Sequence, residues 1–166
     1  MTDTTLTVDD AVLEQLAVAG PRYTSYPTAP EWTDTVGEDE AHARYRAAGA
    51  HADQPLSLYV HLPFCSRLCL YCGCTVEISG RQDRADRYLD AVAREIELVA
   101  ADLGERRGVA QMHWGGGTPT FLSVEQLRRL HGHITDAFHF VPGAEVSIEV
   151  DPHVTTPEQV DTLFDL

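Results

Sequence analysis

The chain has 166 residues, of which 43% are hydrophobic, a composition that supplies the core of one domain or of one piece of a larger domain. Its formal net charge of −14 argues against nucleic acid or an anionic membrane as a partner, and no apolar run approaches membrane-spanning length. All 12 basic residues are arginines, so the chain lacks the lysine that a Walker-A phosphate loop, a Schiff-base enzyme or a pyridoxal-phosphate site requires.

Residues 1–52 are predicted to form helices and an extended arm in front of the main domain. A capping pattern and helical spacing predict a short helix within residues 1–20, and a second short helix is expected over residues 38–48. Between them, residues 21–30 hold three prolines and two tyrosines, which predicts an extended arm. The arm is either a surface linker or a segment packed near a site, and the second interpretation is favoured by its large side chains, Arg22, Tyr23 and Tyr26.

Residues 53–166 alternate between strand-like and helix-like segments. Strands are predicted at residues 56–62, 109–114 and 145–150, and helices at residues 81–103, at residues 122–140 and from residue 156 onward. The order β-α-β-α-β-α is typical of a parallel sheet with right-handed crossover helices, so the predicted fold class is α/β. The first strand, LSLYVHL, carries no charged residue and is expected to be buried on both faces.

Three strands do not close a barrel, and the sequence stops inside a predicted helix. The sequence therefore predicts the N-terminal part of a larger β/α barrel or doubly wound sheet. In such a piece, the third strand has an exposed edge and the first strand has uncovered apolar surface.

All four cysteines lie within the segment HLPFCSRLCLYCGC, which follows the first strand. Cys65, Cys69 and Cys72 have the spacing C-x3-C-x2-C, which lets three thiolates converge on one four-iron, four-sulfur cluster. An electron-transfer cluster normally has four cysteine ligands, so a cluster with three leaves one iron open to a substrate or cofactor. The spacing therefore favours a reactive [4Fe-4S] site.

A tetrahedral zinc site made from all four cysteines is the main alternative. Zinc ligands usually come as two separated pairs, whereas these cysteines form one run. In an extended chain, Cys72 and Cys74 would point to opposite faces, which makes it difficult for Cys74 to complete the same site. A disulfide is less favoured, because the N-terminus shows no signal peptide and a reducing compartment is expected.

Two further motifs follow the second and third predicted strands, where the carboxyl ends of parallel strands carry the chemistry of α/β folds. The segment GGGTP is either a flexible turn or, as its lack of side chains favours, a backbone that a ligand can approach. Glu149 is expected inside an apolar strand, paired either with an arginine or with a ligand. Five histidines are interpreted as other than ligands: His61 and His113 as supporting or core residues, and His131, His133 and His139 as surface residues.

Together these motifs resemble a known family. The cysteine motif after a first strand, with a glycine-rich segment after the second, looks like the radical S-adenosylmethionine (radical SAM) superfamily. The segments PRYTSYPTA, YVHLPFC, CxxxCxxCGC, HWGGGTPT and SIEVDP occur in this order and resemble the oxygen-independent coproporphyrinogen III oxidase family. The resemblance covers residues 21–152. It implies the N-terminal part of a radical SAM (β/α) partial barrel at residues 53–166, preceded by the helical and extended arm of residues 1–52.

The resemblance also implies roles for individual residues. Cys65, Cys69 and Cys72 would ligate the cluster, and Cys74 would be an additional cysteine near the site. The matches to contacts of a first S-adenosylmethionine are Tyr59, Tyr71, Gly116 and Glu149, and the matches to contacts of a second are Gly117 and Thr118. Position 71 departs from the family, which commonly has phenylalanine there. The arm that contains Arg22, Tyr23 and Tyr26 would help to form the substrate pocket.

The activity implied by the resemblance is the oxygen-independent oxidative decarboxylation of coproporphyrinogen III to protoporphyrinogen IX in haem biosynthesis. Its cofactors would be a [4Fe-4S] cluster and two S-adenosylmethionine molecules. The implied partners are a porphyrinogen substrate and an electron donor such as flavodoxin or ferredoxin, without nucleic acid or a membrane span. The implied protein is cytoplasmic and monomeric when full length. Family members are larger than this chain, so the chain alone is expected to be inactive.

Two other functions are considered. A haem chaperone of the same superfamily would resemble the barrel, but such proteins typically lack the tyrosine-proline arm and a cysteine at position 74, so these features favour the oxidase. A zinc-stabilised structural module would use the same cysteines without iron or sulfide.

Overall fold

The computed structural model describes residues 10–11, 14, 31, 33, 35–70 and 72–166. The chain divides into two compact units, Met1–Gly37 and Glu38–Leu166, and the fold below is that of the second. Of the helix predicted within residues 1–20, the three described residues are helical. The arm of residues 21–30, with its predicted substrate-pocket residues, lies outside the described part of the chain.

The second unit begins with helix α2 (Glu38–Gly49), which agrees with the short helix predicted at residues 38–48. The division predicted between residues 52 and 53 stays a prediction. In the described part of the chain, no helix has the length and apolar character needed to cross a membrane.

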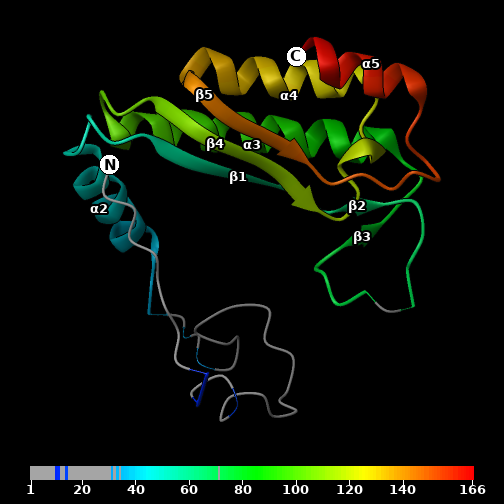
Figure 1. Ribbon diagram of the computed structural model, residues 1–166, viewed down its shortest axis with the longest axis horizontal. Helices are drawn as coiled ribbons and strands as arrows, with labels where there is room; N and C mark the ends of the chain where they lie inside the picture. The colour runs from blue at the N-terminus through cyan, green and yellow to red at the C-terminus, as the bar shows by residue number, and fades with distance from the viewer. Residues whose placement is uncertain (1–9, 12–13, 15–30, 32, 34, 71) are drawn as a thin grey trace. The chain divides into compact units, whose positions relative to one another are not determined.

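A three-stranded parallel sheet forms the centre of this unit, with β4 (Gly108–Gly116) between β1 (Leu56–Leu62) and β5 (His139–Ile148). Helices α3 (Gln82–Leu103) and α4 (Val124–Ala137) lie along one face, and α5 (Pro157–Asp165) packs beside α4 (Figure 1). A short 3-10 turn, η2 (Pro119–Phe121), follows β4. The predicted α/β class, with three parallel strands and crossover helices, is confirmed.

Local signals explain where the helices begin. Ser123 and Thr156 each accept a hydrogen bond from the backbone three residues later, and the glutamine at that position reaches back to the cap, so both form capping boxes. Pro157 occupies the first turn of α5, where a missing N–H has no cost. Helix α3 ends at Gly104, whose φ of 59° suits glycine.

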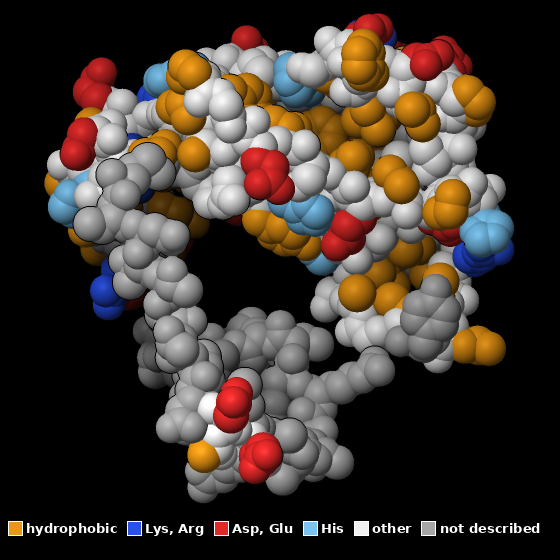
Figure 2. All heavy atoms as spheres, viewed as in Figure 1, with side chains coloured by type: hydrophobic (Ala, Val, Ile, Leu, Met, Phe, Trp, Pro, Cys, Tyr) orange, Lys and Arg blue, Asp and Glu red, His pale blue; other side chains and the backbone are white. Residues whose placement is uncertain are grey.

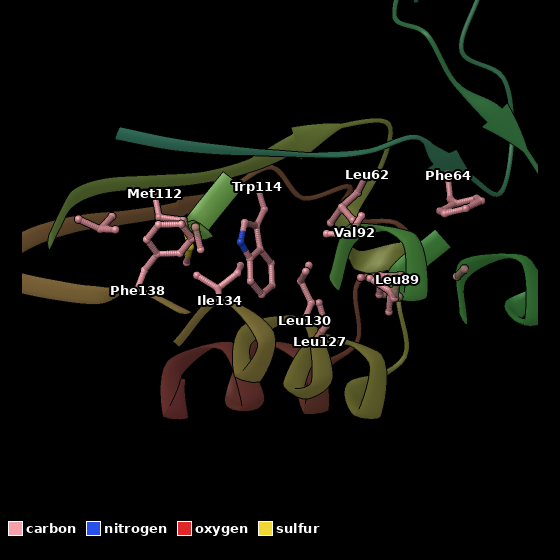
Figure 3. Packing of buried hydrophobic residues seen from close by; sticks show 14 of the residues in the cluster. Leu62, Phe64, Leu89, Val92, Met112, Trp114, Leu127, Leu130, Ile134 and Phe138 are labelled. Carbon is pink, nitrogen blue, oxygen red and sulfur yellow. The ribbon is translucent and has the colours of Figure 1, made fainter. Parts of the chain in front are cut away.

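The hydrophobic core lies between the sheet and the two long helices (Figure 3). Figure 3 shows the indole of Trp114 pointing from β4 toward Ile134 and Leu130 of α4. The buried residues come from β1, β4, α3 and α4 and from the residues directly beside them: Leu62, Phe64, Ala85, Leu89, Val92, Met112, Trp114, Leu127, Leu130, Ile134 and Phe138 among them. Each large side chain buried in this way contributes about 1.5–3 kcal/mol of transfer free energy. The helical spacings of α3 and α4 therefore identify the core-facing sides correctly.

The boundary between α4 and β5 differs from the prediction. Helix α4 ends at Ala137 rather than at residue 140, and β5 spans His139–Ile148 rather than residues 145–150. Phe138 is buried although its backbone is extended, so an apolar residue at this position does not distinguish helix from extended chain. The pairing of β5 with β4 is irregular between Phe140 and Glu145, a stretch that contains proline and glycine. Proline and glycine are unfavourable inside strands, so the first half of β5 was not predicted from the sequence.

The expectation that β1 is buried on both faces is wrong. Its side chains alternate: Ser57 and Tyr59 are exposed, whereas the intervening leucines and valine pack toward the core. In the described part of the chain, α3 and α4 cover one face of the sheet and leave the other open (Figure 1). The polar members of LSLYVHL recur every second residue, and this alternation is the signal that was missed.

Two of the three α4-region histidines were wrongly expected at the surface. His131 and His133 are half-buried, and burial lowers the pKa of His131. His131 lines a cavity of about 240 Å³ together with Trp114 and Leu163, because α5 covers this side of α4. His139 is exposed, as expected.

A buried glutamine of α5 connects that helix to the turn after β4. The side-chain amide of Gln159 donates to the carbonyls of Thr120 and Leu122, at 2.8 and 2.7 Å. Gln159→Leu is expected to lower the free energy of unfolding by about 1–3 kcal/mol, because both buried carbonyls lose their donor. Urea denaturation measures this change. The exposed neighbour provides the control: Glu158→Gln should change stability by less than about 0.5 kcal/mol, and an equal effect of both would contradict the prediction.

Helices α2 and α3 are joined by a charged contact. The His42 ring hydrogen-bonds to Asp102, and Arg46 donates to the other oxygen of the same carboxylate at 3.0 Å. The hydrogen bond to Asp102 raises the pKa of His42, and the same bond lowers the pKa of Asp102. Glu38 adds to the rise at His42, and Arg46 opposes it.

These shifts predict a pH-dependent stability. His42 stabilises the fold fully below its unfolded pKa of 6.5 and loses this contribution as pH rises through its raised folded pKa. Asp102 contributes fully above 3.8 and loses its contribution as pH falls through its lowered pKa. The stability difference between the wild type and His42→Gln in thermal denaturation should therefore be largest below pH 6.5 and shrink as pH rises above it, through the raised pKa. A difference that stays constant on both sides of pH 6.5 and into the alkaline range would contradict the assignment.

Candidate functional site

The three motifs singled out from sequence lie at the carboxyl end of the sheet. The cysteine segment follows β1, the glycines end β4, and Glu149 follows β5. Because β1, β4 and β5 are parallel and adjacent, their carboxyl ends meet at one edge. The sheet therefore gathers segments that are far apart in sequence.

The cysteine segment is a loop that leaves the sheet through a short two-stranded stem, β2 (Phe64–Cys65) and β3 (Glu77–Ile78). The stem is held by hydrogen bonds from the Glu77 amide to the Pro63 carbonyl, at 2.6 Å, and from the Ser79 amide to the Cys65 carbonyl, at 3.0 Å. Cys65 is the first residue of the motif and the only one of the four cysteines in the stem. Its position is therefore fixed by the sheet, whereas the other three cysteines lie on the loop.

All four thiols are free, and Cys65, Cys69 and Cys72 are half-buried while Cys74 is exposed. Among the described residues, no three cysteine, histidine or carboxylate groups are already arranged to hold a metal ion. The three predicted ligands thus share one loop without converging. The donor set fits an iron–sulfur cluster chemically, because three accessible thiols on one loop are the soft ligands that such a cluster requires.

The expectation that Cys72 and Cys74 point to opposite faces assumed an extended chain, but residues 72–74 are not in a strand. The neighbouring Cys72 thiol raises the pKa of Cys74, first through side-chain hydrogen bonding and then through its charge. The exclusion of Cys74 from the cluster stays a prediction.

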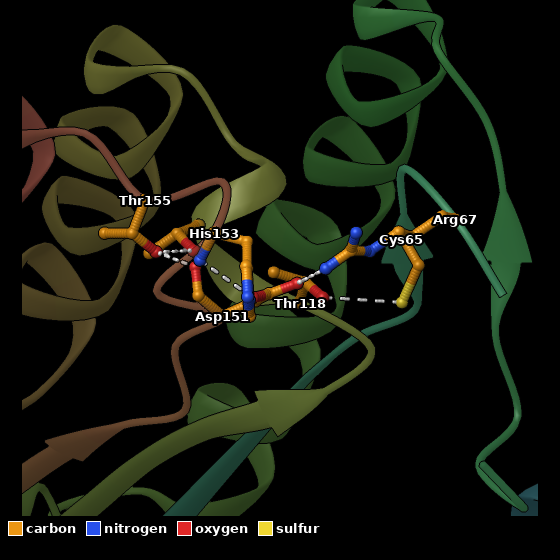
Figure 4. A network of polar contacts seen from close by, with 7 residues as sticks. Cys65, Arg67, Thr118, Asp151, His153 and Thr155 are labelled. Atoms are coloured by element: carbon orange, nitrogen blue, oxygen red, sulfur yellow. Dashed lines mark hydrogen bonds and ion pairs between the residues drawn. The ribbon is translucent and has the colours of Figure 1, made fainter. Parts of the chain in front are cut away.

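The glycine segment is held against the stem of the cysteine loop. The Gly117 amide donates to the Leu62 carbonyl at 2.9 Å, and the Thr118 amide donates to the Phe64 carbonyl at 2.8 Å. The Thr118 hydroxyl lies 3.5 Å from the Cys65 sulfur (Figure 4). A methyl group on Gly117 would lie 2.7 Å from the Phe64 carbonyl oxygen and 3.0 Å from the Cys65 sulfur. Only glycine leaves room for this approach.

The preceding glycine is constrained by its backbone. Gly116 has a φ of 116°, which residues with a side chain rarely adopt, and a methyl group there would lie 2.6 Å from the His61 ring. The His61 ring in turn contacts the Thr75 carbonyl at 3.2 Å, on the cysteine loop. The segment is therefore a fixed part of β4 and of the turn after it, and it is not a flexible turn.

Glu149 differs from its predicted environment. It lies just beyond the end of β5, and its side chain is 55% exposed, so it is not enclosed in an apolar strand. One carboxylate oxygen accepts the Gly116 amide at 3.1 Å, and the other lies 3.5 Å from Nε2 of His113. Among the described residues, the basic side chain within 4 Å of the Glu149 carboxylate is that of His113 and not that of an arginine. The carboxylate is accessible to a ligand as well as anchored.

The open face of the sheet is polar near this edge. Ser57, Tyr59 and His61 of β1 share it with alternate residues of β4 and β5, and Figure 2 shows acidic and histidine side chains close together near the middle of the surface. Burial raises the pKa of Tyr59, and the nearby charges of Glu149 and Cys74 add to this rise. Tyr59 thus lies on the same face as Glu149 and within electrostatic reach of the cysteine loop.

The cysteine loop also contacts the segment that follows β5, and this contact was not expected from the sequence. Arg67, inside the cysteine motif, forms an ion pair with Asp151 at 3.6 Å (Figure 4). Hydrogen bonds from the backbone and ring of His153 lower the pKa of Asp151, with a smaller contribution from Arg67. The predicted residues Arg22, Tyr23, Tyr26 and Tyr71 lie outside the described residues. Of the remaining predicted residues, the structure brings Cys65, Gly117 and Thr118 together, and it joins Gly116 to Glu149 by a hydrogen bond.

Comparisons with known proteins agree on one family. The model of the radical SAM superfamily matches residues 59–166. Oxygen-independent coproporphyrinogen III oxidase from Escherichia coli (strain K12) is 45% identical over 155 residues, which are 93% of this chain and 33% of the relative. The protein of the same description from Mannheimia haemolytica is 43% identical over 144 residues, which are 87% of this chain and 96% of that relative.

A solved structure is also similar. The coproporphyrinogen III oxidase from Escherichia coli, described as a radical SAM enzyme, superposes with a TM-score of 0.77 and 41% identity, over 95% of this chain and 34% of the other. The chain thus spans about a third of the length of the Escherichia coli relative.

Proposed function

The chain belongs to the radical SAM superfamily and, within it, to the oxygen-independent coproporphyrinogen III oxidase family, which is a family of oxidoreductases. From this premise we propose that the chain carries the part of the family's enzyme that binds the cluster and the cofactor. The proposed reaction is the oxidative decarboxylation of coproporphyrinogen III to protoporphyrinogen IX without oxygen. The observation that carries the proposal is the close approach of the glycine segment to Cys65: the Thr118 hydroxyl lies 3.5 Å from the Cys65 sulfur, and Gly117 has no room for a side chain beside it.

Cys65, Cys69 and Cys72 would hold a [4Fe-4S] cluster. When bound, such a cluster supplies a low-potential electron and one iron that is open to the cofactor. The stem fixes Cys65, so assembly has to bring the loop cysteines toward it. Cluster binding should therefore rearrange the loop, as metal binding does where a site forms on binding.

The residues around Glu149 would hold the first S-adenosylmethionine. A half-exposed carboxylate suits the amino group of the cofactor, and the Tyr59 ring on the same open face offers an aromatic surface. Gly116 would complete this set with its backbone, and Tyr71 would join it from the cysteine loop. A second cofactor molecule would contact Gly117 and Thr118.

The remaining parts of the proposal concern partners. The arm with Arg22, Tyr23 and Tyr26 would contribute to the pocket for the porphyrinogen. An electron donor such as flavodoxin or ferredoxin would supply the reducing electron. We place the reaction in the cytoplasm and expect a monomer for the full-length protein.

The test is anaerobic reconstitution of the chain with iron and sulfide, followed by assays for iron, acid-labile sulfide and S-adenosylmethionine binding. Turnover of coproporphyrinogen is measured in the same preparation and in a protein that contains the remaining two thirds of the relatives' length. Stoichiometric zinc without sulfide would overturn the proposal. Tight haem binding without coproporphyrinogen turnover in the longer protein would favour the chaperone function instead.

A further inference from the structure

A row of three polar side chains crosses the open face of the sheet. Tyr59 of β1 and Ser147 of β5 both pair in register with His113 of β4. The Tyr59 ring stacks on the His113 ring, with centroids 5.9 Å apart and planes 14° from parallel. On the other side, Nδ1 of His113 lies 2.8 Å from the Ser147 hydroxyl. The imidazole is therefore held by one neighbour on each side.

The free nitrogen of this imidazole faces Glu149. Nε2 of His113 lies 3.5 Å from one carboxylate oxygen, and the other oxygen accepts the Gly116 amide at 3.1 Å. The approach depends on the absence of a side chain between them. A methyl group on Gly115 would lie 3.0 Å from Nε2 of His113 and 3.1 Å from the Glu149 carboxyl group. Gly115 thus leaves the space that His113 and Glu149 share.

We propose that Ser147 and His113 form a positioning chain for Glu149. In this positioning chain, the Ser147 hydroxyl donates its one proton to Nδ1 of His113, 2.8 Å away, in preference to the Met112 carbonyl at 3.5 Å, so the ring proton lies on Nε2 and faces the carboxylate. The Gly116 amide fixes the second oxygen, and the carboxylate keeps free lone pairs for a ligand with a cationic amino group. His113 acts through Glu149 as a positioning residue. The ligand's identity as S-adenosylmethionine rests on the proposed function, whereas the chain of contacts does not.

The alternative is that His113 only fills space beneath Tyr59. His113→Phe separates the two roles, because phenylalanine keeps a ring for stacking and removes the N–H. His113→Gln is the matched conservative variant, since its side-chain amide restores a donor without the ring. Glu149→Ala removes the acceptor altogether and sets the maximum effect.

Hydrogen exchange of the Gly116 amide, measured by NMR in the chain without cofactor, tests the proposal. His113→Phe should accelerate exchange by roughly tenfold, toward the rate in Glu149→Ala, and His113→Gln should restore most of the protection. The Gly117 amide, which donates to the Leu62 carbonyl, is the internal control and should not change. Unchanged Gly116 exchange in His113→Phe, or in Glu149→Ala, would overturn the positioning chain.

Cofactor binding gives a second readout. In the reconstituted chain, His113→Phe should weaken S-adenosylmethionine binding by roughly tenfold at unchanged iron and sulfide content. Introduced into a Glu149→Gln variant, His113→Phe should add nothing further, because it acts through that carboxylate. Wild-type affinity in His113→Phe would overturn the inference and leave the proposed function standing. Absence of binding in the wild type would instead contradict the proposed function, and the exchange experiment would still decide the positioning chain.

Discussion

Gly117→Ala is expected to lower the free energy of unfolding by about 2–3 kcal/mol, because the new methyl group would meet backbone that cannot move independently. The Phe64 carbonyl oxygen would lie 2.7 Å away and the Pro63 carbonyl carbon 2.9 Å away, and both belong to the stem that positions Cys65. Relieving the clash requires the stem to separate from β4. We therefore expect the melting temperature to fall by roughly 5–10 °C and the reconstituted iron content to fall with it.

Two glycines provide matched controls. Around Gly73, in the cysteine loop, and Gly132, within α4, no atom lies within 4 Å of the position that a methyl group would take. Gly73→Ala should leave stability and iron content unchanged. Gly132→Ala should stabilise the chain by about 0.5–1 kcal/mol, because alanine loses less backbone entropy in a helix. A Gly117→Ala variant as stable as the Gly73→Ala variant would show that the stem does not need this close approach.

Cys65→Ala, Cys69→Ala and Cys72→Ala are each expected to abolish bound iron and acid-labile sulfide after anaerobic reconstitution. Two remaining thiolates of the motif cannot hold the three corners of a cluster that the proposed site requires. Metal analysis and the visible absorption of the reconstituted protein measure the loss. Melting temperatures without iron should stay near the wild-type value, because all three side chains are half-buried and make few core contacts.

Cys74→Ala is the decisive control for these variants. It should retain iron and sulfide, because Cys74 is proposed to be near the cluster without binding it. The Cys72 thiol is near enough to raise the pKa of Cys74, so proximity alone does not distinguish a ligand from a neighbour. Equal loss in all four variants, with zinc bound by the wild type, would instead indicate a four-cysteine zinc site.

The local parts of this fold were predictable from sequence. The capping residues Ser123 and Thr156, the apolar stripe of α3 and the range of β1 all follow from residues close in the chain. The end of α4 was not predictable, because Phe138 is buried in an extended conformation at a position where helical spacing also expects an apolar residue. The burial of β1 also failed, since the sequence does not state which face of a sheet the helices will cover.

The candidate site, too, was predictable from sequence only in its local parts. The short sequence spacing of Cys65, Cys69 and Cys72 is enough to place them in one segment, and the sequence also shows that position 117 has no side chain. Only the tertiary structure decided that His113 faces Glu149 and that Arg67 meets Asp151, because these contacts join different strands or loops. The sequence determines the local structure of residues that are close together in the chain, because bond lengths, backbone preferences and periodicity act over short distances. Which side chains meet across the sheet depends on the register of its strands, and packing of the whole core sets that register.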